Sequence, residues 1–275
     1  MQILMCPPQY YGIEYEINPH MKLENKSDHF KAIKQWDSLF DELGKLDVRI
    51  EVIKPEKGWP DMCFAANGAV TLNKRAIIAK FKHPERQGES QFYEKWFVDN
   101  GYEIIGLPNY CVFEGAGDAL WAGKKMYVGY GQRSNVLSSN RLLYEFIGHG
   151  DKHQCNTGCS VLNDVIPVEL VDPYFYHLDT CFCPIDDKLA LIYEPAFGFN
   201  SLVAIKQNLD LISVPDEEAM KFACNAVVVG KHVIMPSGCE WTERQLKERG
   251  YTPHPLDMSE FIKAGGACKC LTLSI

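Results

Sequence analysis

The chain has 275 residues, a hydrophobic share of 46% and a formal net charge of −8. That length and hydrophobic share suffice for a sizeable core, and the acidic balance argues against nucleic acid or an anionic membrane as a partner. We therefore expect a small-molecule partner, no nucleic acid and no membrane, and the composition leaves a homo-oligomer open.

The first residues predict neither a secretory signal nor a membrane span, because Met1 to Met5 is a short apolar stretch with no basic start. We expect a cytoplasmic protein whose eleven cysteines are reduced. His153, Cys155 and Cys159 have metal-like spacing. Because no partner cluster of matching spacing occurs elsewhere, we expect a reduced loop there and no metal.

One short apolar strand recurs five times along the chain, each time led by a polar or reactive residue. The leading residues are Asn67, Asp118, Asp179, Asn225 and Cys270. After the first four copies, a polar or glycine-bearing turn leads into a second apolar strand, which predicts hairpins. The fifth copy has no room for a second strand, and Met1 to Met5 can supply it, closing a ring.

The segments between these copies complete a β-β-α-β unit. In chain order, we expect second strands at 75–81, 125–130, 188–193 and 231–236, helices at 28–43, 90–99, 138–147, 203–209 and 242–249, and following strands at 48–55, 102–108, 165–173, 211–215 and 251–257. No linker or low-complexity tract divides the chain, so we expect one α/β domain over residues 1–275. A closed ring with its helices outside is the economical arrangement.

Cys270 is a candidate nucleophile. It follows Gly265 and Gly266, whose missing side chains would let a ligand approach closely, and it precedes an expected strand at 271–273. The alternative is an ordinary buried cysteine. Cys268 would point to the same strand face, so local sequence does not choose between the two cysteines.

His177 and Asp179 are candidates for proton transfer and cation binding. Two residues apart, they would share one face of an extended segment. A histidine there could polarise a thiol and activate water. Glu114 and Asp118 stand among glycines before the second hairpin. The alternatives are a structural histidine and a plain turn.

Four motifs together carry a family resemblance: Asn67, 113–118, 177–179 and 265–273. In this order they resemble the guanidine-modifying superfamily with the five-bladed α/β propeller (pentein) fold. It includes arginine deiminases, dimethylarginine dimethylaminohydrolases, glycine amidinotransferases and arginine dihydrolases. The resemblance covers nearly the whole chain.

The resemblance implies a role for each polar residue. It makes Cys270 the nucleophile and His177 the general acid and base. It makes Glu114 and Asp179 the carboxylates that hold the guanidinium, joined by Asp118. It requires no metal or organic cofactor.

Asn67 bears on the subclass. Deiminases typically carry an aspartate there, whereas the segment 60–67 is similar to arginine dihydrolases and succinylarginine dihydrolases. The N-terminal residues around Asn18 are similar to bacterial arginine dihydrolases, although His20 stands where that group has tryptophan. An amide both donates and accepts, so Asn67 and Asn18 could bind the neutral ureido group of a first product. Turn capping is the alternative for both.

Arg86 and Arg133 lie in segments that resemble the family's α-carboxylate clamps. A guanidinium fork pairs well with a carboxylate, whereas the alternative is a solvated surface arginine. Asn225 lines the expected ring without an assigned role.

The expected activity is hydrolysis of the guanidino group of L-arginine, or a derivative, through a covalent intermediate on Cys270. The dihydrolase form yields ornithine, ammonia and carbon dioxide. The alternatives are an arginine deiminase that yields citrulline, a dimethylarginine dimethylaminohydrolase, an amidinotransferase, and a non-catalytic propeller that serves as a binding module.

Overall fold

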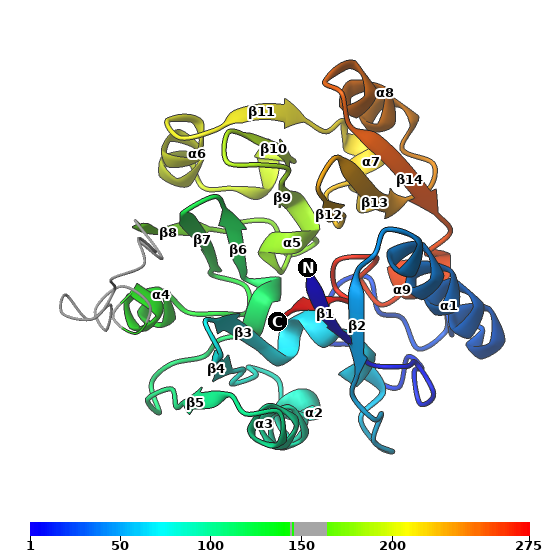
Figure 1. Ribbon diagram of the computed structural model, residues 1–275, viewed down its shortest axis with the longest axis vertical. Coiled ribbons are helices and arrows are strands. Elements are labelled where there is room, and N and C mark those ends of the chain that lie inside the picture. The colour runs from blue at the N-terminus through cyan, green and yellow to red at the C-terminus, as the bar shows by residue number, and fades with distance from the viewer. Residues whose placement is uncertain (144, 146–163) are drawn as a thin grey trace.

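Five three-stranded sheets surround a common centre in the computed structural model, which describes residues 1–143, 145 and 164–275 (Figure 1). The longer helices lie at the periphery and the innermost strands face the centre. We number these sheets blades 1 to 5, and blade 5 joins the two ends of the chain. The predicted ring of β-β-α-β units is confirmed.

The inner pair of strands in blades 1 to 4 is an antiparallel hairpin, as predicted. The pairs are β3 (Ala69–Leu72) with β4 (Arg75–Ile78), β6 (Ala119–Ala122) with β7 (Lys125–Tyr130), β9 (Phe182–Pro184) with β10 (Leu189–Ile192), and β12 (Val227–Val229) with β13 (His232–Pro236).

The outer strand of each of these blades runs parallel to the second strand. The outer strands are β5 (Glu103–Ile105), β8 (Asp164–Glu169), β11 (Asp210–Ser213) and β14 (Thr252–Leu256). A parallel neighbour requires a crossover, which places helices outside the ring.

Blade 5 closes the ring as predicted. Strand β1 (Gln2–Met5) pairs antiparallel with β15 (Leu273–Ser274), with Leu4 opposite Leu273, and parallel with β2 (Arg49–Val52). Both chain ends therefore lie near the centre (Figure 1).

The helices vary from one turn to more than four. The longer ones are α1 (His29–Lys45), α3 (Ser90–Asp99), α4 (Val136–Leu143), α6 (Phe199–Lys206) and α8 (Glu240–Glu248), and the single turns are α2 (Pro84–Gln87), α5 (Leu178–Cys181), α7 (Asp216–Ala219) and α9 (Ser259–Ile262). Helix α1 begins where the Asp28 side chain accepts the Lys31 backbone N–H at 3.0 Å, which caps its first turn. Its buried positions recur every three or four residues, so one face packs against the ring.

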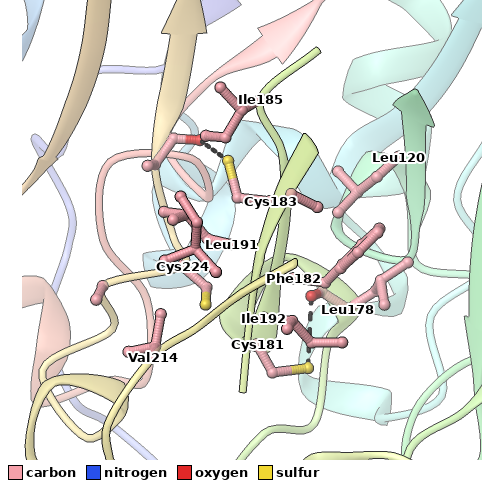
Figure 2. Packing of buried hydrophobic residues seen from close by; sticks show 14 of the residues in the cluster. Leu120, Leu178, Cys181, Phe182, Cys183, Ile185, Leu191, Ile192, Val214 and Cys224 are labelled. Atoms are coloured by element: carbon pink, nitrogen blue, oxygen red, sulfur yellow. Dashed lines mark hydrogen bonds between the residues drawn. The ribbon is translucent and has the colours of Figure 1, made fainter. Parts of the chain in front are cut away.

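The apolar core lies between neighbouring blades. Figure 2 shows Phe182 and Leu191 of blade 3 between Leu120 of blade 2 and Cys224, which precedes blade 4. Because each sheet buries side chains against the next one, the blades hold each other in position around the centre.

Two local predictions are wrong. His177 is extended, but Leu178–Cys181 is a helical turn, in which the Thr180 N–H and hydroxyl bond to the His177 carbonyl at 3.1 and 2.6 Å. The expected strand at 271–273 begins only at Leu273, because the Thr272 N–H donates to the Lys269 carbonyl at 3.0 Å in a turn. His177 and Asp179 therefore do not share one strand face, nor do Cys268 and Cys270.

Several absences hold for the described part of the chain. None of its helices is long and apolar enough to cross a membrane. Its cysteines are free thiols, and no three of its histidines, cysteines and acids are placed to hold a metal. The expected reduced loop at 153–159 lies outside the described residues.

Candidate active site

The candidate active site lies where turns ahead of the inner strands bring polar side chains together. A narrow cavity is lined by Asn18, Asp61, Asn67, Arg86, Arg133 and Cys270, together with apolar neighbours. Its free volume is about 10 Å³, roughly the space of one water molecule. A ligand of amino-acid size therefore enters only if part of the lining moves.

Cys270 faces this cavity, whereas Cys268 is buried in the apolar core between helices and strands. The Cys270 Sγ lies 3.3 and 3.5 Å from the two carboxylate oxygens of Asp179. Burial raises the pKa of the Cys270 thiol well above its ordinary value, and the Asp179 carboxylate raises it further. Cys270 is therefore a thiol at neutral pH that donates its S–H to Asp179.

His177 is held by an ionised carboxylate. Its Nε2 lies 2.7 Å from Glu114 Oε2, which also accepts from Arg133 Nη1 at 3.0 Å. Burial opposes ionisation of Glu114, but Arg133 and His177 outweigh it and hold the pKa of this carboxyl well below its usual range. Since a carboxylate only accepts, Nε2 carries a proton, and Nδ1 is the ring nitrogen left to give or take a proton.

The other two predicted carboxylates are fully buried. Burial raises the pKa of Asp118 to about 6, and it raises the pKa of Asp179 to about 6 as well. Asp118 accepts the Leu178 N–H at 3.0 Å and the Ser134 hydroxyl at 2.5 Å. Asp118 therefore fixes the backbone next to His177, whereas Asp179 touches the candidate nucleophile.

Asn67 links His177 to a buried arginine. Its Oδ1 accepts from Arg86 Nη1 at 2.9 Å, and its Nδ2 lies 3.4 Å from His177 Nδ1. Arg86 also pairs with both oxygens of Glu89 at 2.9 and 2.8 Å. This pairing fixes the amide of Asn67 with its N–H groups toward the imidazole.

The two predicted clamp arginines are buried, not solvated. Arg86 and Arg133 are 3% and 5% exposed and both line the cavity. Arg133 stacks on Tyr176 and donates to the Ile17 carbonyl at 2.9 Å. Each guanidinium is already paired with a buried carboxylate, Arg86 with Glu89 and Arg133 with Glu114.

Asn18 joins the N-terminal segment to the loop before Cys270, because its Nδ2 donates to the Ala264 carbonyl at 3.0 Å. Its Oδ1 accepts the backbone N–H groups of His20 and Met21, which is the predicted turn capping, and Asn18 also lines the cavity.

Gly265 has φ +85°, and a Cβ there would lie 2.8 Å from the Tyr176 hydroxyl, so this close approach requires glycine.

Sequence reasoning assigned no role to two residues that the structure brings to this site. Asp61 is 1% exposed and lines the cavity, and burial raises the pKa of its carboxyl against the opposing effects of Arg86 and the Tyr15 hydroxyl. Asn225 contacts Cys270, with Nδ2 at 3.1 Å from Sγ. The recurrence of polar residues before inner strands pointed to Asn225, but no local pattern distinguished Asp61.

The fold and the site define a guanidine-modifying enzyme of the pentein class, and solved structures support this. The chain aligns with the N-terminal domain of ArgZ, an arginine dihydrolase, with a TM-score of 0.89 and 38% identity. The alignment covers 99% of this chain and 96% of that one. The pentein α/β propeller is therefore confirmed.

Residues 12–275 match the family described as N,N dimethylarginine dimethylhydrolase, eukaryotic. The chain is 38% identical over its whole length to the bifunctional arginine dihydrolase/ornithine cyclodeaminase ArgZ of Synechocystis sp., of which it spans only 38%. It is 34% identical to the dimethylarginine dimethylaminohydrolase of Mycobacterium tuberculosis, over 98% of this chain and 84% of that one.

The chain therefore belongs to the dimethylarginine dimethylaminohydrolase family. It is a guanidino-group hydrolase of the arginine dihydrolase or dimethylarginine dimethylaminohydrolase type. This family membership disfavours the non-catalytic binding module.

Proposed function

We propose that the protein hydrolyses the guanidino group of L-arginine, or a close derivative, as an arginine dihydrolase that yields ornithine, ammonia and carbon dioxide. The observation that carries the proposal is the amide of Asn67 beside His177, at a position where a deiminase would have a carboxylate. The similarity to ArgZ, an arginine dihydrolase, supports it.

The cavity offers a partner for each end of an arginine molecule. Arg86 and Arg133, each paired with a buried glutamate, line the cavity with guanidinium groups that suit the α-carboxylate, and the Asp61 carboxyl suits the ammonium group. Asp179, in contact with Sγ, suits the guanidinium. A cation beside Asp179 offsets the negative charge that opposes ionisation of Cys270, so substrate binding favours the reactive thiolate.

The first half-reaction replaces one nitrogen of the guanidinium by oxygen. Cys270 loses its S–H proton to solvent, and Nδ1 of His177 takes up a proton from solvent. The thiolate adds to the guanidinium carbon, Nδ1 gives its proton to the departing nitrogen, and the C–N bond breaks to release ammonia. His177 Nδ1 then takes a proton from water, the hydroxide adds to the same carbon, and the C–S bond breaks. Citrulline and free Cys270 result.

The second half-reaction needs the ureido group to stay bound. Asn67 can donate to the ureido oxygen, which a carboxylate could not do. Cys270 attacks the ureido carbon and expels a second ammonia, leaving a carbamoyl group between the sulfur and the substrate nitrogen. Water cleaves the C–S bond, and the resulting carbamate loses carbon dioxide to give ornithine.

Asn67→Asp tests this proposal. We expect the variant to retain the first deimination, because a carboxylate suits a cation, and to lose most of the second step, so that citrulline accumulates where the parent makes ornithine. The measurement is amino-acid analysis of products from L-arginine, with ammonia counted per turnover. Asn135→Asp, whose amide bonds to the Tyr110 carbonyl away from the cavity, is the matched control.

Two results would contradict the assignment. A parent protein that stops at citrulline is a deiminase, and Asn67 is then incidental. A variant that makes ornithine at the parent rate assigns the second step to another residue, with Asn18 the first to test.

Dimethylarginine hydrolysis is the second candidate, favoured by the family match and by the mycobacterial relative. Release of dimethylamine from dimethylarginine, at a higher kcat/KM than ammonia from L-arginine, would support it over the dihydrolase.

A further inference from the structure

Asn225 is fully buried before strand β12, and the chemistry proposed above does not use it. Its Oδ1 accepts the backbone N–H groups of Ala267 and Cys270 at 3.0 and 3.2 Å. Its Nδ2 donates to the Asp179 carbonyl at 3.0 Å and to the Cys270 Sγ at 3.1 Å. The amide thus fills its two acceptor and two donor positions around the candidate nucleophile.

These contacts allow only one orientation of the amide. If the oxygen and nitrogen of Asn225 were exchanged, Nδ2 would face two backbone N–H donors and Oδ1 would face a carbonyl oxygen. Both arrangements repel, so the N–H group must point at the sulfur.

The backbone holds this orientation from both sides. The Asn225 N–H donates to the Phe222 carbonyl at 2.8 Å, and the Asn225 carbonyl accepts the Lys269 N–H at 3.2 Å. Phe222 has φ +62°, in the left-handed region that bulky residues rarely adopt. Strain of this kind persists only where the surroundings enforce it, and here it accompanies the turn that places Asn225.

The charged and titratable groups around Sγ do not include a contacting cation among the described residues. Burial is the largest cause that raises the pKa of Cys270. Asp179, which contacts the sulfur from helix α5, raises it further. The Tyr176 phenol, in the segment before that helix, also interacts with Cys270. The Lys269 ammonium acts on Asp179. The groups that favour ionisation of Cys270 are neutral donors, the Ala267 backbone and the Asn225 side chain.

We propose that Asn225 is a catalytic residue, whose amide N–H stabilises the thiolate of Cys270 after the S–H proton is lost to solvent. A thiolate is a stronger acceptor than a thiol, so a fixed N–H donor favours the charged form. The inference rests on the proposed function only in taking Cys270 as the nucleophile.

Two variants separate the donor from its surroundings. Asn225→Asp keeps the shape and the acceptor oxygen but turns an oxygen toward the sulfur. Asn225→Leu removes the donor without adding a charge. The readout is the rate at which iodoacetamide alkylates Cys270 from neutral to alkaline pH, with Cys270→Ser as the blank.

We expect both variants to alkylate at least about tenfold more slowly than the parent at neutral pH, with the profile displaced upward by about one pH unit. Thr272→Val is the matched control, because its hydroxyl bonds within the same turn, to the Lys269 carbonyl at 3.0 Å, without touching the sulfur. The control should keep the parent profile. Circular dichroism and thermal unfolding establish that each variant is folded.

Parent-like alkylation by folded Asn225→Leu overturns the proposal, even if Asn225→Asp is slow, because the added charge alone would then explain the slow variant. If Asn225→Leu does not fold, the smaller uncharged Asn225→Ala takes its place, with slow alkylation supporting the proposal and a parent-like profile overturning it. Alkylation needs no guanidine substrate. A protein that makes no ornithine therefore fails the dihydrolase assignment without affecting this test.

Discussion

The five repeats build two cavities of opposite character. The inner strands themselves line a cavity of about 660 Å³, mainly with apolar side chains such as Val70, Leu120 and Phe182. The narrow polar cavity around Cys270 is lined instead by segments ahead of β3, β9 and β15, by Arg86 and Arg133 from beyond the second strands of blades 1 and 2, and by the N-terminal loop. Each repeat thus places polar groups ahead of its inner strand and apolar groups along it. The polar residues of the site and the apolar residues of the strands are therefore only a few positions apart in the sequence.

Two cysteines show what this separation changes. Cys183 lines the apolar cavity and Cys270 the polar one, and burial raises the pKa of both thiols, that of Cys183 to about 12. The Cys183 Sγ contacts backbone carbonyls, which only accept hydrogen bonds, and the carbonyl of Ala226 lies 3.6 Å away. The Cys270 Sγ contacts a carboxylate and an amide N–H donor. Reactivity therefore depends on the partners of the sulfur, since burial is common to both.

The largest expected effect is the loss of kcat/KM when the sulfur of each of these two cysteines is replaced by oxygen. Cys270→Ser should lower kcat/KM at least about a thousandfold, because the hydroxyl ionises far less readily than the thiol and Cys270 is the only cysteine of the described residues that lines the cavity. Cys183→Ser should stay within about twofold of the parent. Ammonia release from L-arginine measures both, and thermal unfolding establishes that both fold. Substantial residual turnover in Cys270→Ser would show that Cys270 is not the nucleophile.

A smaller effect is expected when the carboxylate behind His177 is neutralised. Glu114→Gln can present an N–H to Nε2 and move the imidazole proton to Nδ1, the atom that must act as base. Loss of general base catalysis should lower kcat about a hundredfold.

Glu218→Gln is the matched control for Glu114→Gln, because this buried carboxylate accepts the Trp241 and Thr242 N–H groups at 2.7 and 2.9 Å outside the narrow cavity. It should lower the unfolding temperature and leave kcat nearly unchanged. Equal kcat values for the two variants would show that Glu114 does not act through His177.

The ring could be predicted from sequence because its signals are local. Hairpins, helix spacing and the apolar stretch Met1 to Met5 each lie within a few residues, and closure followed from the missing second strand of the fifth repeat. The five leading residues were expected to surround one axis, and three of them, Asp179, Asn225 and Cys270, are in contact.

The partners within the site could not be predicted, because they depend on tertiary contacts. Glu114 was expected to hold substrate, and its Oε2 bonds instead to His177, 63 residues away. The role of Glu114 toward a guanidinium stays a prediction. The pairing of Arg86 with Asn67 could not be predicted from neighbouring residues either. The pairing of Arg86 with Glu89 could, because the two residues are one helical turn apart in the sequence.

The smallest expected effect is on the pH dependence of the unfolding free energy. Its sign differs between Asp118, behind His177, and Asp186, which lines the apolar cavity. Asp118 is buried behind His177, and burial raises its pKa to about 6. Asp186 lines the apolar cavity, and hydrogen bonds from Tyr251 and from the Lys188 and Leu189 backbone outweigh its partial burial and lower its pKa. A raised carboxyl pKa destabilises the folded protein above that pKa, and the cost disappears as the pH falls below the unfolded value. A lowered pKa stabilises it above the unfolded value, and the gain is lost as the pH falls.

Asp118→Asn removes a titration whose folded pKa lies above the unfolded value near 3.8. The asparagine can still accept the Leu178 N–H and can donate to the Ser134 hydroxyl oxygen. Relative to the parent, the variant should therefore gain up to about 3 kcal/mol of unfolding free energy between pH 4 and pH 8. Asp186→Asn should change in the opposite direction, losing stability relative to the parent as the pH rises from 3 to 8. Urea unfolding of the three proteins across this range measures both slopes. Slopes of the same sign for the two variants would show that burial does not distinguish these carboxylates and would remove the electrostatic contrast between the cavities.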